Sequence, residues 1–232
     1  MIGLRSPLHR FALGALLVAV PLFALWWLSV DMLVAGLRPA TAWLAQLLLP
    51  VTAIEARPGE GWVVRTSLKI IAAAGTPQYG HTAAFDLGNY FARRVTLAWP
   101  VLLAMLLAPP RPRYLILRIL IAAAALSLLF GLSESAIAFC RVTALANHMA
   151  VAACDTAAPP YFVAAPAYGP VALFAARFGY TAALFFLPLV APAILWLALN
   201  PAARSMFLDF GGPSRNGAPG REPEARPPQP TP

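Results

Sequence analysis

The residues most able to do chemistry in this chain are two cysteines with an arginine and a histidine between them. Cys140 and Cys154 are the only cysteines, and Arg141 and His148 lie between them. One hypothesis is a disulfide, which an oxidising compartment would favour. A second is a pair of inert thiols. A third is a nucleophilic thiol activated by the imidazole, although a helix would separate Cys140 and His148 by about two turns.

One carboxylate, Glu134, stands inside an apolar stretch, between Ser133 and Ser135. An ionisable group within a membrane span is a functional hypothesis by default because its burial is costly. The alternative is a packing residue that is hydrogen-bonded or paired with an arginine. The sequence has no metal-ligand spacing, phosphate-binding loop or nucleophile elbow. We therefore expect no cofactor and no metal.

Four apolar stretches must position these side chains, and each is close to or above the length needed to cross hydrocarbon of roughly 30 Å. Hydrophobic residues make up 60% of the chain and charged residues only 11%. Helices are expected because lipid offers backbone groups no water to bond with. We predict an all-α integral membrane protein, an up-down bundle with a small extracytoplasmic β-hairpin and loop insertion. The predicted transmembrane helices cover 11–30, 95–108, 114–139 and 171–199.

Basic residues at the ends of these stretches orient the chain. The formal net charge is +8, and arginines gather in short clusters before the first span, between the second and third, and after the fourth. With four spans these clusters share one side, which the positive-inside rule makes cytoplasmic. Arg93 and Arg94, which flank the second span on the other side, oppose this orientation. The segments outside the spans are a cytoplasmic N-terminus at 1–10, an extracytoplasmic region at 31–94, a cytoplasmic turn at 109–113, an extracytoplasmic loop at 140–170 and a disordered cytoplasmic tail at 200–232.

The region at 31–94 is predicted to hold a short helix and then a hairpin. Residues 40–49 are apolar but too short to span, and Trp43 favours a helix lying at the outer membrane interface. Alternating apolar and polar residues on both sides of 58–61 predict a β-hairpin. The residues after the hairpin, 72–89, are rich in small and polar types and are expected to form an irregular loop.

The register of the predicted hairpin follows from the need for one apolar and one charged face. A three-residue loop sets Ile54 opposite Thr66 and Glu55 opposite Arg65, whereas a four-residue loop would mix the faces. Gly61 is then expected in the left-handed conformation of a bulge. The apolar face must pack on something, since a lone hairpin is marginally stable in water.

Prolines and aromatic residues in the apolar stretches give the chain a family resemblance. They are Pro21, Phe23, Trp26, Trp27, Pro39, Pro50, Trp99, Pro100, Pro188, Pro192, Trp196 and Asn200. With the β-like segment, this pattern resembles exosortase H-associated membrane proteins over most of residues 10–200. The resemblance implies a non-catalytic accessory protein of a sorting system in the bacterial inner membrane. Its partners would be membrane lipid, an exosortase and the substrates of that exosortase.

Two other classes of protein stay open. Exosortases use cysteine, arginine and histidine at the outer membrane face, and Cys140, Arg141 and His148 are similar to that set. A membrane cysteine transpeptidase or protease would follow, but the chain has fewer spans and lacks the small residues after the cysteine. A small transporter or channel subunit would need a polar path, and Glu134 is nearly alone. Nucleic acid is not an expected partner because the arginines mark span ends and form no recognition surface.

Overall fold

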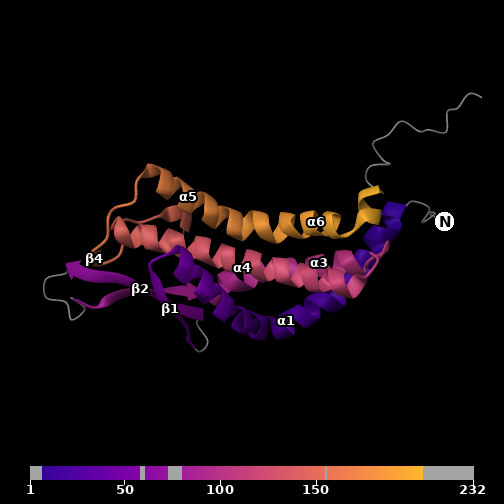
Figure 1. The fold of residues 1–232 in the computed structure, drawn as a ribbon, viewed down its shortest axis with the longest axis horizontal. Helices are drawn as coiled ribbons and strands as arrows, with labels where there is room; N and C mark the ends of the chain where they lie inside the picture. The colour runs from indigo at the N-terminus through magenta and orange to yellow at the C-terminus, as the bar shows by residue number, and fades with distance from the viewer. Residues whose placement is uncertain (1–6, 58–60, 73–79, 155, 206–232) are drawn as a thin grey trace, which may run out of the picture.

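The computed structural model describes residues 7–57, 61–72, 80–154 and 156–205, which form long helices with a small sheet at one end (Figure 1). The α-helices are α1 (Pro7–Leu48), α2 (Asn89–Thr96), α3 (Ala98–Leu107), α4 (Leu115–Ala146), α5 (Pro170–Thr181) and α6 (Leu187–Leu199). A 3₁₀ turn covers Ala152–Cys154, and a π-helical turn, Ala182–Phe186, joins α5 to α6. The strands are β1 (Val51–Arg57), β2 (Gly61–Ala72), β3 (Thr82–Gly88) and β4 (Phe162–Val163).

Four helical segments are long and apolar enough to cross a membrane, which confirms the prediction of a mostly helical protein with four candidate spans. They cover His9–Leu48, Asn89–Leu107, Leu115–Ala146 and Pro170–Leu199. Large apolar side chains lie exposed along their outer faces, among them Leu28, Ile116 and Leu189. A continuous apolar surface of this kind is unfavourable in water and suits a hydrocarbon solvent.

Helix α1 is continuous where the sequence predicted a span followed by a separate short helix. Pro39 lies inside it, and the helix runs on to Leu48. Leu37, Thr41 and Ala45 are buried at four-residue spacing, and α1 packs against α4. This packing outweighs the local cost of the proline, which bends helices rather than always ending them. The location of residues 40–49 at a membrane interface stays a prediction.

Helices α1 and α4 are both longer than a bilayer is thick. The 42 residues of α1 and the 32 residues of α4 extend roughly 63 Å and 48 Å at 1.5 Å per residue. Helix α4 continues through residues 140–146, where the sequence predicted a loop. These extra lengths reach the end of the molecule that carries the sheet (Figure 1).

The beginning of α1, the turn after α3 and the end of α6 meet at the opposite end of the molecule. The Phe11 ring stacks on Trp196 with centroids 4.7 Å apart. The Asn200 side-chain amide donates a 2.8 Å hydrogen bond to the Pro110 carbonyl oxygen. A Cβ atom on Gly14 would lie 2.8 Å from Pro109 Cδ, so this glycine permits close contact. The chain therefore begins its first span and ends its last at the same end.

The sheet is antiparallel in the order β1-β2-β3, and β4 pairs with the far part of β2. The predicted hairpin is confirmed as β1 and β2. The prediction of an irregular loop over 72–89 is wrong at its C-terminal part, which forms β3. In β3, Ala83 and Leu87 are buried while Ala84 and Asp86 are exposed. This alternation with a period of two is short, and Thr82 is the one β-branched residue of the strand, so its sequence signal was weak.

The predicted hairpin register is wrong by two residues. Ile54 lies opposite Val64, not Thr66, and Glu55 lies opposite Val63, not Arg65. The assignment of faces survives because side chains alternate with a period of two. Glu55 and Arg65 still form an ion pair across the strands. A bulge between residues 51 and 53 then shifts the register by one more residue, so that Val51 lies opposite Thr66.

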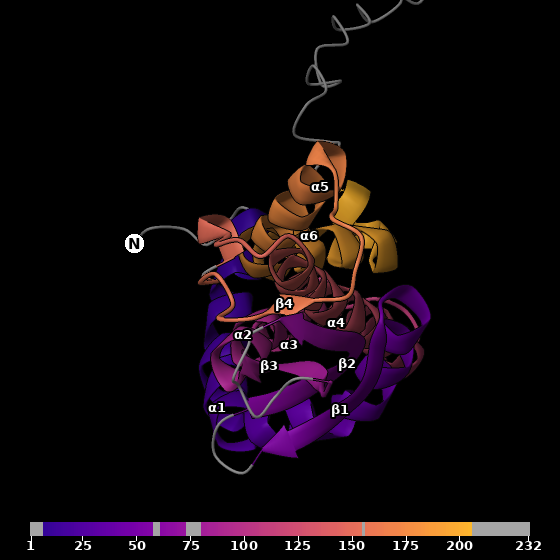
Figure 2. The same ribbon diagram turned by 90° about the vertical axis from the view of Figure 1, so that its left-hand side faces the viewer.

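The apolar face of the sheet packs on the middle and the C-terminal part of α4. Trp62 meets the Phe130 ring edge-to-face at 6.1 Å, and Leu68 and Ile70 belong to one buried cluster with Val142. Figure 2 shows α4 between the sheet with α1 on one side and α5 with α6 on the other. The sheet is thus fixed to the helices by a hydrophobic core, which is the support that the hairpin needed.

We expect Gly61→Ala to destabilise the protein strongly. Gly61 has φ +115° as predicted for a bulge glycine, and a Cβ atom there would clash with the Leu87 carbonyl oxygen. Strain of this kind costs about 1–3 kcal/mol, and thermal unfolding in detergent measures it. Gly36→Ala is the control: nothing lies within 4 Å of the added carbon, and alanine favours a helix. Equal melting temperatures for the two variants would contradict the assigned backbone conformation.

Candidate functional site

The two cysteines lie together at the sheet end of the molecule. Cys140 is on α4 and Cys154 is on the 3₁₀ turn, both are fully buried, and the structure joins them in a disulfide with Cα atoms 6.1 Å apart. This bond ties the segment after α4 back to that helix.

No described hydrogen bond links the three residues of the thiol hypothesis to one another. The Cys140 sulfur is bonded to Cys154, and a sulfur in a disulfide cannot act as a thiolate nucleophile. His148 Nδ1 lies 3.1 Å from the Tyr161 carbonyl oxygen, and its ring stacks on Phe162 at 3.7 Å. Arg141 Nε is buried and has no hydrogen-bond partner in the described part of the chain. No thiol–imidazole pair is formed by these contacts.

Glu134 is buried in α4, with only 1% of its surface exposed. Its Oε1 atom has no hydrogen-bond partner among the described residues, and the neighbouring Ser135 hydroxyl also has none. The ion pairs formed within the described ranges do not include this carboxylate. A buried carboxyl oxygen without a partner is costly. Glu134 therefore stays a functional hypothesis, and no described residue gives it the hydrogen bond or arginine pair of the alternative interpretation.

The outer face of the sheet carries an exposed set of charges. Arg65 donates hydrogen bonds of 2.8 and 3.1 Å to the Glu55 carboxylate, and Arg57 lies 3.4 Å from Asp86. The hydrogen bond from Arg65 is the main reason why the pKa of Glu55 lies below its usual value. Lys69 is exposed on the same face. Exposed pairs contribute little to stability, so this face matters chiefly as a charged surface that another protein could meet.

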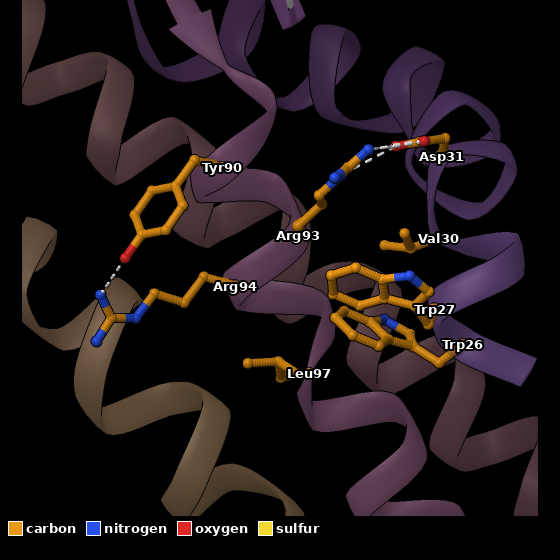
Figure 3. Close-up of a pocket in the computed structure, with 8 residues that line it drawn as sticks. All are labelled: Trp26, Trp27, Val30, Asp31, Tyr90, Arg93, Arg94 and Leu97. Atoms are coloured by element: carbon orange, nitrogen blue, oxygen red, sulfur yellow. Dashed lines mark hydrogen bonds and ion pairs between the residues drawn. The ribbon is translucent and has the colours of Figure 1, made fainter. Parts of the chain in front are cut away.

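A pocket of about 560 Å³ opens between α1 and α2 (Figure 3). Arg93 closes one side by binding both Asp31 carboxylate oxygens at 2.8 Å. These two residues are 62 positions apart in the sequence, and their pairing was not predicted. An acidic residue after the first span and an arginine before the second were its only sequence signals. The lining residues are Trp26, Trp27, Val30, Asp31, Tyr90, Arg93, Arg94 and Leu97.

Arg94 points to the other side of α2, away from Asp31 (Figure 3). Its Nη1 atom donates a 2.9 Å hydrogen bond to the Tyr90 hydroxyl. Its guanidinium carbon lies 4.3 Å from the centre of the Phe185 ring, a cation–π contact between α2 and the π-helical turn. The sequence marked Arg93 and Arg94 only as charges beside a span. The structure shows that one is paired with a carboxylate and the other is held by aromatic groups.

Four candidate membrane-spanning helices with a strand layer at one end define a multi-pass membrane protein. Within the described residues, no group of three or more histidine, cysteine, aspartate or glutamate side chains is gathered where it could hold a metal ion. The chain belongs to the family of exosortase H-associated membrane proteins, whose model matches residues 5–203. The family resemblance of the sequence is thereby confirmed. No curated protein and no solved structure matches the chain.

Proposed function

We propose that this protein is a non-catalytic accessory subunit of an exosortase sorting system in the bacterial inner membrane. Membership of a family described as exosortase H-associated is the observation that carries the proposal. The strand layer is the part that would meet the exosortase or its substrate, because long helices hold it away from the beginning of α1 and the end of α6 (Figure 1). Its charged outer face, with Arg65 and Lys69, is the proposed contact surface.

The proposed orientation places both termini in the cytoplasm and the sheet outside, with the four spans in an up-down arrangement. The end where α1 begins and α6 ends carries arginines beside the spans, which supports this orientation because basic residues close to span ends favour the cytoplasmic side. The sheet end also holds basic residues, three of them in ion pairs with Asp31, Glu55 and Asp86, and these oppose it. The arginines at the first end are Arg10, Arg111, Arg113, Arg118 and Arg204.

A non-catalytic role is supported by the state of the two sulfurs. A disulfide between Cys140 and Cys154 suits an oxidising space outside the inner membrane, and it removes the nucleophile that an exosortase-like reaction would need. The same bond would stiffen the segment between α4 and α5 that provides β4 for the sheet. The cysteines therefore support the shape of the proposed contact surface.

The proposal is tested by purifying the tagged protein in a mild detergent and measuring the exosortase that accompanies it. We expect wild type to retain the enzyme and the variant Arg65→Glu/Lys69→Glu to retain on the order of tenfold less, because reversed charges oppose a complementary surface. Arg177→Glu is the matched control, since Arg177 is exposed on α5, outside the sheet. Absence of the exosortase from wild-type preparations, or equal loss in the control, would count against the proposal.

The orientation has its own test, which does not depend on a partner. Ser67 is exposed on β2, between Arg65 and Lys69, so Ser67→Cys places a thiol on the proposed contact surface. A membrane-impermeant thiol reagent added to intact spheroplasts should label this variant. Labelling only after lysis would place the sheet in the cytoplasm and remove the proposed meeting with an external sorting enzyme.

A further inference from the structure

The pocket between α1 and α2 is lined by charged and apolar side chains (Figure 3). Its charged groups are the guanidinium groups of Arg93 and Arg94 and the Asp31 carboxylate. Arg93 is neutralised by Asp31, whereas Arg94 has no carboxylate partner within the described ranges, so the lining keeps one positive charge. Its apolar groups are the two indole rings on α1 together with Val30 and Leu97.

We propose that this pocket binds an anionic glycerophospholipid, with its phosphate on Arg94 and its chains leaving along the indole rings. An arginine has five N–H donors, and Tyr90 accepts the one described hydrogen bond from Arg94 to another side chain. Further donors of the same group can therefore bind phosphate oxygens. The Tyr90 hydroxyl and the Phe185 ring hold the guanidinium in place, which lowers the entropy that binding would cost.

The depth of Arg94 fits the headgroup region of a bilayer. Arg94 is fifteen residues from Pro109, which lies at the opposite end of the molecule, a distance of roughly 22 Å along helices α2 and α3. This approaches the roughly 30 Å of hydrocarbon that a span must cross. Trp26, Trp27 and Tyr90 lie around the pocket, and such rings prefer the boundary between water and hydrocarbon. A lipid phosphate occupies the same level.

The apolar side of the pocket shows why the ligand needs acyl chains. Trp27 is 69% exposed, and Val20, seven residues earlier on the same face of α1, is 68% exposed. These side chains form an apolar stripe that leads from the pocket toward the middle of the membrane-spanning region. A soluble phosphate would satisfy Arg94 but would leave this stripe uncovered. An amphiphile with its phosphate at Arg94 would cover both.

The charge of the pocket favours an anionic headgroup over a zwitterionic one. Arg93, Arg94 and Asp31 together leave one positive charge, which a lipid of single negative charge would balance. An ethanolamine headgroup would instead bring a second positive charge close to the two arginines. Such like-charge proximity is unfavourable where water is partly excluded. Phosphatidylglycerol is therefore the probe of choice.

The test is a titration of the delipidated protein with phosphatidylglycerol, followed by native mass spectrometry. We expect Arg94→Gln to weaken binding about tenfold, the usual effect of losing a hydrogen bond to a charged group. Arg177→Gln removes the same charge from an exposed position outside the pocket and should leave the affinity unchanged. Phosphatidylethanolamine with the same acyl chains should bind more weakly than phosphatidylglycerol. Equal affinity of the Arg94 and Arg177 variants would overturn the proposal.

Two further arms distinguish the source of the phosphate and guard against misfolding. Trp27→Ala should weaken the lipid but not glycerol phosphate, and glycerol phosphate binding as tightly as the lipid would overturn the choice of ligand. If Arg94→Gln does not fold, Tyr90→Phe takes its place: it keeps the charge, removes the orienting hydrogen bond and should weaken binding severalfold. Unchanged affinity in Tyr90→Phe would contradict the assigned role of that bond. The assay needs no exosortase, so its result is independent of the proposed partner.

Discussion

Cys154→Ser should lower the free energy of unfolding by about 3 kcal/mol, the entropic effect expected for a loop of this length. The sequence separation of the two cysteines is 14, and the bond fixes the 3₁₀ turn to α4. Without it, the chain from α4 to α5 would gain freedom in the unfolded state, and β4 would lose support. Thermal unfolding of the purified protein in detergent measures the effect, with and without a reducing agent on wild type.

The double variant Cys140→Ser/Cys154→Ser is the control for this prediction. Both variants lose the same disulfide bond, so their melting temperatures should agree. Removing the second sulfur removes no further interaction. Alkylation of unfolded protein should find both thiols blocked in wild type before reduction. Two free thiols in protein from intact cells would contradict the disulfide.

The same cysteines decide between accessory protein and enzyme. If the sulfur has only a structural role, Cys140→Ala should reduce the processing of sorted proteins no more than it reduces the amount of folded protein. The cysteine-transpeptidase alternative predicts complete loss of processing while Cys154→Ala, which breaks the same bond, retains it. Processing is read from the molecular mass of a sorted substrate. A selective loss in Cys140→Ala would falsify the non-catalytic proposal.

The four helical spans could be predicted because their signal is length and apolar composition, which need no knowledge of neighbours. The continuity of α1 could not. Pro39 and the charged Arg38 indicated a break in the helix, since proline usually interrupts helices when only the local sequence is considered. The deciding evidence is the burial of Leu37, Thr41 and Ala45, and this depends on α4, which comes far later in the sequence.

The strands show the same division between local and long-range causes. Alternation predicted the hairpin and which face of it would be apolar, because one period of two governs both strands. Register was missed because shifts by two residues keep that alternation, so only the actual loop and the bulge near Val51 select one. Strand β3 was missed because its short alternation gains meaning only when it pairs with β2.

The pocket of Figure 3 was beyond sequence reasoning for a different reason. Each of its members had an ordinary explanation alone: an indole anchor, a flanking arginine, an acidic residue after a span. Only the packing of α1 against α2 brings Asp31 to Arg93. By contrast, the disulfide could be proposed from the sequence. Cys140 and Cys154 are the only cysteines in the chain, and they are close together in the sequence.

Trp62→Ala should lower the free energy of unfolding by about 3–5 kcal/mol, the usual cost of truncating a buried aromatic side chain. Trp62 is 5% exposed, and its ring meets Phe130 of α4 at 6.1 Å. Truncation would leave a cavity between the sheet and the helix and remove an aromatic pair. Thermal unfolding in detergent measures the loss, and Trp62→Phe should restore part of it because a ring again fills the site.

Trp43→Ala is the matched control for the buried tryptophan, because Trp43 is 66% exposed on α1. It should unfold at nearly the wild-type temperature. Trp62→Ala also tests the sheet separately from the spans. Its helices should still insert into the membrane. Its retention of the exosortase should fall, because the contact surface is no longer held in place. If Trp62→Ala keeps wild-type stability, the sheet is not anchored on α4. If it unfolds yet retains the exosortase fully, the helices and not the strand layer bind the partner.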